Sequence, residues 1–270
     1  MTMENQPSIS RRGLLKWAGA GSIALAAAGA LSACSPAQSE LASTQGDTGA
    51  ETDSALQERY ADLPVEESSA YAVIVGGGAG GLLAAYKLAK EGKTPLLLEK
   101  GPSCASSNLA NLSGPAACNT SNQKASGITI ATERALYDHY VEWARGSANT
   151  KLLKNLLSNS TEAFESLVDC GLHFYNYVEY TGDPQYGESL KWAPLHNFVE
   201  VGEERIQPIV SAIEAMGGSF IYNCEATEVV LEDGVVAGVK AIRDNNTVLS
   251  IATKAVFLAT GGFGASEEMI

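Results

Sequence analysis

The chain has 270 residues, of which 45% are hydrophobic and 18% charged, too apolar for a disordered chain and too polar for several membrane spans. Its 18 Lys and Arg residues against 31 Asp and Glu give a net charge of −13, which repels the phosphates of nucleic acids. The length fits one domain or one and a half. We therefore expect a globular protein that does not bind nucleic acid.

The first 33 residues have the layout of an export signal. Arg11 and Arg12 precede an uncharged run, residues 17–33, made mostly of Ala, Gly and Leu. The adjacent arginines resemble the twin-arginine type of signal, which exports proteins already folded and often with a cofactor bound. A permanent membrane span is the weaker interpretation, because the run is weakly apolar and barely long enough to cross a bilayer.

The run ends in Leu-Ser-Ala-Cys at positions 31–34, which resembles a bacterial lipobox. The resemblance implies cleavage before Cys34 and lipidation of its thiol. The protein would then be anchored by lipid in the cell envelope, on the outer face of the cytoplasmic membrane. An ordinary cleavage site with a chance cysteine is the alternative. Residues 34–69, rich in Ser, Ala, Thr, Gln, Glu and Gly, predict a flexible linker with one short helix around 54–60, followed by a domain over 70–270.

The remaining cysteines show no metal-binding pattern. No pair has the C-x-x-C spacing, and the three histidines do not complete a ligand set, so we expect no metal site. A disulfide can form outside the cytoplasm, but the sequence does not pair these cysteines. A protein that folds before export first meets a reducing cytosol, which favours free thiols at Cys104, Cys118, Cys170 and Cys224.

A glycine-rich loop lies between a predicted strand and a predicted helix. Residues 71–75 are apolar and predict a buried strand, and the loop Gly-Gly-Gly-Ala-Gly-Gly follows at 76–81. Residues 82–91 have helical periodicity, and 95–99 predict a second buried strand that ends on Glu99. Strand, loop, helix, strand and acidic residue in this order predict a Rossmann-like dinucleotide-binding domain of the α/β class.

Each position in this loop has a physical role in binding a dinucleotide. Gly76 allows a tight turn, Gly78 lets the backbone approach a pyrophosphate, and Gly81 lets the helix pack against the strand. The helix N-terminus offers free N–H groups to phosphates, and Glu99 would accept hydrogen bonds from a ribose. The loop alone does not separate FAD from NAD. The residues expected to contact the dinucleotide here are Gly76, Gly78, Ala79, Gly80, Gly81 and Glu99.

The residues after Glu99 resemble the FAD-binding domain of the fumarate reductase/succinate dehydrogenase flavoprotein family. The likeness is to its flavocytochrome c-like branch, in which a Gly-Gly-Asn stretch and a later Gly-Gly pair pass the flavin. Here Ser106 and Ser107 replace the first two glycines, and Gly114 with Pro115 replaces the later pair. The resemblance implies cofactor contacts from Lys100, Ser107, Asn108 and Gly114.

The C-terminal part continues this resemblance. It predicts a helix over 203–216, a strand over 218–223, a hairpin of 225–231 with 235–242, and a strand over 251–259 that leads into Ala-Thr-Gly-Gly-Phe. In the family, the backbone at the position of Ala226 contacts the adenine, and the turn of Thr260, Gly261 and Gly262 passes close to the dinucleotide. The resemblance covers residues 71–270.

The middle of the chain is less informative. We expect helices over 132–145, 150–159 and 161–170, then an aromatic, strand-like segment over 172–180. That segment either lines the flavin site or, as the simpler interpretation, packs into the hydrophobic core. His139 is expected to be structural, whereas His196, on a loop, packs or approaches a substrate. No histidine lies between Glu99 and residue 129, so the FAD is expected to bind non-covalently.

The resemblance implies an FAD-dependent oxidoreductase that passes electrons through FAD to the C=C bond of an unsaturated organic acid. The chain has no C-x-x-C-H haem motif, so a separate donor, a cytochrome or quinol-linked protein, is expected. The family's capping domain and proton-donor arginine would follow Ile270, so we expect a domain incomplete at its C-terminus, either the N-terminal part of a longer product or a split or decayed copy. The alternatives are a non-catalytic dinucleotide-binding lipoprotein, a steroid-dehydrogenase-like FAD enzyme, and an NAD-binding protein.

Overall fold

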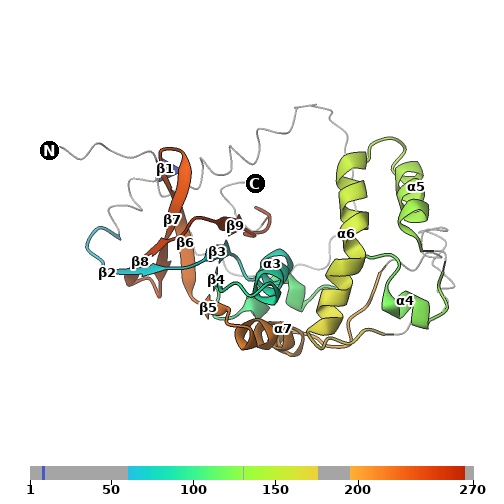
Figure 1. Cartoon of the computed structure of the whole chain (residues 1–270), viewed down its shortest axis with the longest axis horizontal. Helices are drawn as coiled ribbons and strands as arrows, with labels where there is room; N and C mark the ends of the chain where they lie inside the picture. Colours follow the sequence, from blue (N-terminus) through green and yellow to red (C-terminus); the bar gives the residue numbers. More distant parts are fainter. Residues whose placement is uncertain (1–7, 10–59, 130, 176–194, 265–270) are drawn as a thin grey trace, which may run out of the picture.

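A computed structural model describes residues 8–9, 60–129, 131–175 and 195–264 (Figure 1). Two sheets lie at one end of this part of the chain and the helices α5 (Glu133–Trp143) and α6 (Thr150–Asp169) at the other. Helices α3 (Ala79–Lys90) and α7 (Glu203–Ala215) lie between them. Apart from Ser8–Ile9, the expected export signal, the lipobox cysteine and the linker up to residue 59 lie outside the described residues.

A four-stranded parallel sheet forms the centre of the fold, with the strand order β5-β4-β3-β9. Its central strand β3 (Ala72–Val75) is buried at every position, and helix α3 (Ala79–Lys90) connects it to β4 (Pro95–Leu98). The outer strands are β5 (Ser219–Ile221) and β9 (Val256–Leu258). The β3–α3–β4 unit confirms the expected Rossmann-like α/β class, with the helix beginning three residues earlier than its periodicity predicted.

A second, five-stranded sheet has the order β1-β6-β7-β8-β2. Strands β6 (Cys224–Glu232) and β7 (Val235–Arg243) form the expected hairpin. The expected single strand over 251–259 is wrong: the chain forms β8 (Thr247–Ala252) in this sheet and β9 in the other, because Thr253 to Ala255 carry it from one sheet to the next. The remaining strand is β1 (Ser8–Ile9), which pairs with β6.

The last five residues of the expected linker are also a strand. β2 (Val65–Ser69) runs parallel to β8 and pairs with it along its whole length. All five side chains are exposed, so the strand is held by backbone hydrogen bonds and shows no apolar alternation that a sequence pattern could detect. The linker prediction for residues 65–69 is therefore wrong.

The helical part holds α4 (Ser121–Ala125), α5 (Glu133–Trp143), α6 (Thr150–Asp169) and α7 (Glu203–Ala215). The two helices expected over 150–159 and 161–170 are one continuous helix, α6. Ser160, at the expected break, is buried in the same stripe as Leu157 and Phe164, and its hydroxyl donates to the Leu157 carbonyl at 2.8 Å. The short 3-10 helices η1 (Cys104–Ser106) and η2 (Asn108–Ala110) follow β4.

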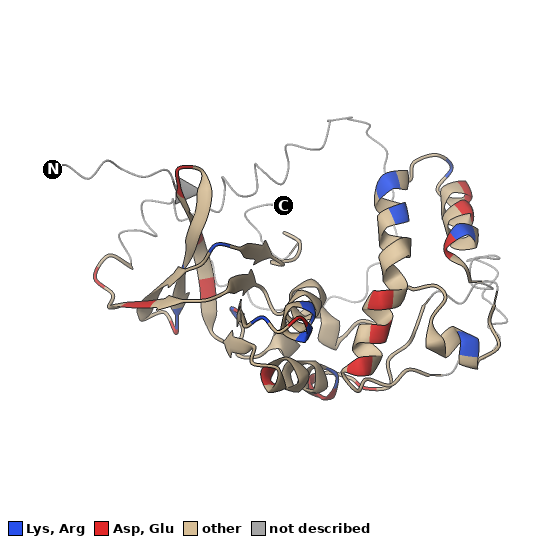
Figure 2. Cartoon of the chain, in the orientation of Figure 1, with Lys and Arg blue, Asp and Glu red and all other residues tan. Residues whose placement is uncertain are grey.

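Ion pairs fasten α6 to α3. In Figure 2, the ribbon of α6 is coloured for basic residues at the end that follows α5 and for acidic residues toward its other end. Lys87 of α3 pairs with Glu162, and Lys90 pairs with Asp169 at 2.7 Å.

The cysteines of the described part, Cys104, Cys118, Cys170 and Cys224, are buried free thiols, as expected. Across the described ranges, no helix is long and apolar enough to cross a membrane, and no cluster of metal-binding side chains occurs.

Candidate dinucleotide-binding site

The glycine loop makes its turn in contact with the end of β9. The Gly76 amide donates to the Leu98 carbonyl at 2.8 Å, and the Ala259 amide donates to the Val75 carbonyl at 2.8 Å. Gly76 has a φ of +105°, and a Cβ there would lie 2.4 Å from the Ala259 carbonyl oxygen. A Cβ at Gly81 would lie 1.9 Å from the Gly76 oxygen. Both glycines therefore occupy positions that admit no side chain.

Gly78 faces open space at the start of α3. It is the N-cap residue, and the nearest heavy atom to a Cβ there would be the Ser107 Cβ, 3.9 Å away. No side chain caps the helix, its first turn holds no acidic residue, and Ala79 and Gly80 are exposed. The unpaired N–H groups and positive dipole end of α3 therefore face a space that suits a pyrophosphate.

The carboxylate of Glu99 holds this loop in place through hydrogen bonds to backbone amides. Its side chain accepts a hydrogen bond from the Gly77 amide at 2.7 Å and another from the Gly101 amide at 2.7 Å, and the residue is 7% exposed. The sequence analysis missed Gly77, although a Cβ there would lie 2.5 Å from the Cys104 sulfur. A carboxylate has about four lone-pair sites, so these two bonds leave capacity for a ribose hydroxyl. The ribose contact stays a prediction.

Cys104 forms part of the wall behind the loop. Burial, and secondarily the charge of Glu99, raises the pKa of its thiol to about 12. The thiol is therefore protonated at neutral pH and has no exposed surface. Its role here is packing against Gly77 rather than nucleophilic chemistry.

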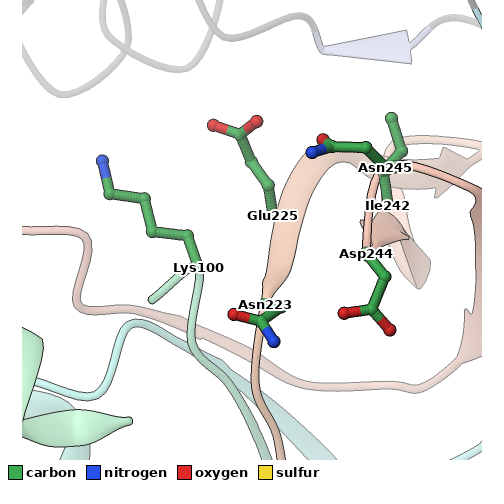
Figure 3. A pocket seen from close by; sticks show the side chains of 6 residues that line it. All are labelled: Lys100, Asn223, Glu225, Ile242, Asp244 and Asn245. Carbon is green, nitrogen blue, oxygen red and sulfur yellow. The ribbon is translucent and has the colours of Figure 1, made fainter. Parts of the chain in front are cut away.

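The start of the β6–β7 hairpin lies beside the Glu99 segment. The Cys224 amide donates to the Glu99 carbonyl and the Asn223 amide to the Gly101 carbonyl, both at 2.9 Å. The side chain of Ala226 packs against the core between the sheets, and its position in β6 pairs with Ala241 of β7. The expected adenine contact of the Ala226 backbone stays a prediction. Next to it lies a polar cavity of about 400 Å³ (Figure 3), with Lys100 and Glu225 extending to the same side; its lining residues are Lys100, Asn223, Glu225, Ile242, Asp244 and Asn245.

Two further predicted segments border the glycine loop. The turn of Thr260, Gly261 and Gly262 is exposed and follows Ala259, whose carbonyl lies against Gly76. Ser107 lies opposite Gly78, and its hydroxyl donates to the Cys104 carbonyl at 2.7 Å. Asn108, which begins η2, is exposed. The structure thus brings the loop and both segments to the carboxyl edge of the parallel sheet, where such folds bind their ligands.

Gly114 has a packing role. A Cβ there would lie 1.6 Å from the His196 carbonyl oxygen, and the flanking residues pair with the segment around His196. The His196 amide donates to the Pro115 carbonyl at 2.9 Å. This close backbone contact by itself explains a glycine at position 114, and the expected flavin contact stays a prediction.

His196 does not face a substrate. It is 0% exposed, its Nε2 lies 2.7 Å from the Thr120 hydroxyl, and its ring centroid lies 4.2 Å from that of Phe164. Phe174 continues this aromatic cluster, 4.5 Å from Phe164 and 4.9 Å from Phe198. The substrate-facing alternative for His196 is therefore wrong, and packing is the role of the aromatic segment as far as Tyr175; residues 176–180 lie outside the described part.

The comparisons with known proteins agree with this geometry. The model of the FAD binding domain family matches residues 72–270, and the chain belongs to this family. Its dinucleotide cofactor is FAD rather than NAD. The residues fit that group, since an open glycine faces an uncapped helix N-terminus and the surrounding glycines leave the backbone accessible.

Curated relatives that the chain matches are named as oxidoreductases or reductases. The chain is 28% identical to the NADH:fumarate oxidoreductase of Klebsiella pneumoniae over 73% of its own length and 21% of the relative. It is 30% identical to the vinyl phenol reductase of Lactiplantibacillus plantarum, covering 73% of the chain and 39% of the relative. It is 24% identical to the acrylate reductase flavoprotein subunit of Shewanella woodyi, covering 73% and 40%. The chain thus spans well under half the length of these relatives.

Solved structures share the fold. A flavocytochrome c3 fumarate reductase in its open conformation superposes with a TM-score of 0.63 at 22% identity, over 84% of this chain and 39% of that one. The 3-ketosteroid-delta4-(5alpha)-dehydrogenase of Rhodococcus jostii gives 0.62 at 22% identity, over 75% and 48%. At this level of identity, the likeness establishes the fold alone.

Proposed function

We propose that the protein is an FAD-dependent reductase that delivers electrons to the C=C bond of an unsaturated organic acid. The observation that carries the proposal is that relatives named for fumarate, vinyl phenol and acrylate each align with 73% of the chain, whose residues 72–270 match the FAD binding domain family. When bound, FAD supplies the hydride that reduction of a C=C bond requires.

The residues of this chain would bind and orient the cofactor non-covalently. Backbone amides of residues 78–81 would hold the pyrophosphate at the N-terminus of α3, where the dipole favours negative charge. Glu99 would hold the ribose while it keeps the loop in place through Gly77. The Ala226 backbone would contact the adenine, and Ser107, Asn108 and the 260–262 turn would border the flavin.

In this proposal, substrate binding and protonation depend on sequence beyond Ile270. A hydride acceptor also needs an acid at the neighbouring carbon and protection from water. By its likeness to the reductases, we place the proton-donor arginine and the capping domain in that further sequence, in keeping with the fraction of the relatives that this chain spans.

We further propose that the protein is exported folded and anchored by lipid at Cys34, and that it receives electrons from a separate donor. The support is Arg11 and Arg12 before an uncharged run, and Leu-Ser-Ala-Cys at positions 31–34. Replacing both arginines by lysine should leave the precursor in the cytoplasm, as read by fractionation and immunoblotting. Normal export of that variant would contradict the twin-arginine interpretation.

The native protein, isolated from the envelope fraction with an antibody against this chain, should contain FAD and oxidise a dithionite-reduced dye when fumarate or acrylate is added. The matched control is Gly78→Val, which should bind FAD about 100-fold more weakly, so that the isolated variant retains little FAD and shows little turnover. Bound FAD without turnover on any acceptor would favour a non-catalytic dinucleotide-binding lipoprotein. Turnover on a 3-ketosteroid alone would favour the steroid-dehydrogenase alternative, which the shared fold supports.

A further inference from the structure

Arg205 is a buried cation whose hydrogen bonds in the described part of the chain all end on backbone carbonyls. It lies in the first turn of α7 and is 3% exposed. Its Nη1 donates to the carbonyls of Leu109 and Leu112, each at 2.7 Å. Its Nε and Nη2 donate to the Glu200 carbonyl at 2.9 and 2.6 Å. One side chain thus joins two segments more than 90 residues apart in sequence.

This arrangement is costly for a purely structural contact. A buried arginine is ordinarily paired with a carboxylate, because removing its charge from water carries a large desolvation penalty. Burial lowers the pKa of Arg205, against the opposing influence of the Glu200 charge. Three carbonyl dipoles and the ring of Phe198, 4.2 Å from the guanidinium carbon, compensate the charge instead.

The segment that Arg205 holds is the second wall of the cofactor site. Residues 107–112 begin at Ser107, which faces the open position at Gly78 where the pyrophosphate is expected. They continue through η2 and end at the carbonyl of Leu112. A second bond from the same side fixes the segment, since the Gly202 amide donates to the Ala110 carbonyl at 3.0 Å.

We propose that Arg205 is a positioning residue for FAD: by holding the carbonyls of Leu109 and Leu112, it sets the distance between the 107–112 wall and the glycine loop. The planar guanidinium suits this role, because it reaches several acceptors at fixed angles, whereas a lysine ammonium is a point charge on a flexible stem. The inference rests on FAD binding and needs no assumption about the substrate.

The test compares Arg205→Met and Arg205→Lys with the unchanged 270-residue chain. Each protein is stripped of flavin and titrated with FAD to obtain Kd, its thermal unfolding is measured without FAD, and the visible spectrum of the bound flavin is recorded. Arg134→Met is the control, since that arginine is exposed and, among the residues that the structure describes, pairs with Asp138 on its own helix.

We expect Arg205→Met to raise Kd for FAD about tenfold or more, Arg205→Lys to raise it less, and the control to leave it unchanged. The spectrum of flavin bound to the Met variant should shift toward that of free FAD. If that variant does not fold, the Lys variant decides, because it retains the cation. A lower unfolding temperature with unchanged Kd and spectrum would overturn the proposal, since Arg205 would then be structural alone. FAD binding without turnover in the native protein from the envelope fraction would leave the inference intact and contradict only the reductase proposal.

Discussion

The glycine loop and the 107–112 wall border the same site but are held in place in different ways. The loop is fixed by contacts between neighbouring strands and by Glu99, which lies 22 residues from its partner Gly77. The wall is fixed by Gly202 and Arg205, which belong to residues 195–205, here called the clamp segment. Arg205 is 96 residues from Leu109 in the sequence. The comparison shows that one half of the site is held by close backbone contacts within the parallel sheet and by Glu99, and the other mainly by a side chain that reaches it from far away in the sequence.

Gly81→Ala should have the largest effect on the loop half. The new Cβ would lie 1.9 Å from the Gly76 carbonyl oxygen. That oxygen belongs to packed backbone, which cannot move aside as a flexible side chain could. We expect a loss of about 3 kcal/mol or more in the free energy of unfolding, measured by urea denaturation of the flavin-free protein. Gly92→Ala is unsuitable as a control because its φ is +72°, so Gly262→Ala, with open space around it, serves instead. Equal stability of the Gly81 and Gly262 variants would break this account.

Gly78→Val separates binding from folding in the same loop. The side chain enters open space, since the nearest atom to a Cβ there is 3.9 Å away, so the fold should survive. The added methyls would occupy the space that the pyrophosphate needs, and we expect FAD affinity to fall about 100-fold, or roughly 3 kcal/mol. Flavin titration and circular dichroism together check this. Unchanged flavin retention would show that the loop does not hold the pyrophosphate.

His196→Ala tests whether this residue of the clamp segment serves stability or substrate binding. The change removes the partner of the Thr120 hydroxyl and leaves a cavity beside Phe164, which should cost about 2–4 kcal/mol of stability. Thermal unfolding measures it, with His173→Ala as control because that side chain is 76% exposed. A loss of stability much smaller than about 2 kcal/mol, together with a changed KM for the substrate, would support a substrate-facing role for His196 instead.

Glu99→Gln should affect both the stability of the loop and the binding of FAD. The neutral amide presents only one acceptor oxygen to the Gly77 and Gly101 amides and weakens any ribose contact. We expect FAD binding to weaken by about 1–3 kcal/mol, the range for hydrogen bonds to charged groups. Titration of the flavin-free protein measures this. Unchanged affinity for FAD with lowered stability would show that Glu99 holds the loop in place through its hydrogen bonds but does not bind the ribose.

The two halves of the site also differ in how far the sequence predicts them. The β3–loop–α3–β4 unit is contiguous in sequence, and Gly76 and Gly81 sit where a Cβ would meet backbone, so a local pattern predicts its fold and most of its residues, with Gly77 as the exception. Arg205 lies in an ordinary amphipathic helix, and nothing near it in sequence indicates that its partners are the carbonyls of Leu109 and Leu112. Strand β2 was not predicted either, because its partner β8 is distant in sequence and its exposed side chains show no apolar pattern.

The smallest expected effect is a pH dependence in the clamp segment. Burial alone would raise the pKa of Glu200, but hydrogen bonds from the amide and ring of His173 outweigh it and leave that pKa below its usual range. A lowered folded-state pKa means that the carboxylate stabilises the fold above its unfolded pKa of about 4.3 and loses this contribution as the pH falls through the folded value. Glu200→Gln should therefore cost about 0.5 kcal/mol at pH 7 and nothing below the folded pKa. Urea denaturation from pH 7 to acid measures the difference, and a gap between the two proteins that stays constant over that range would show that the Glu200 carboxylate does not hold the clamp segment through its charge.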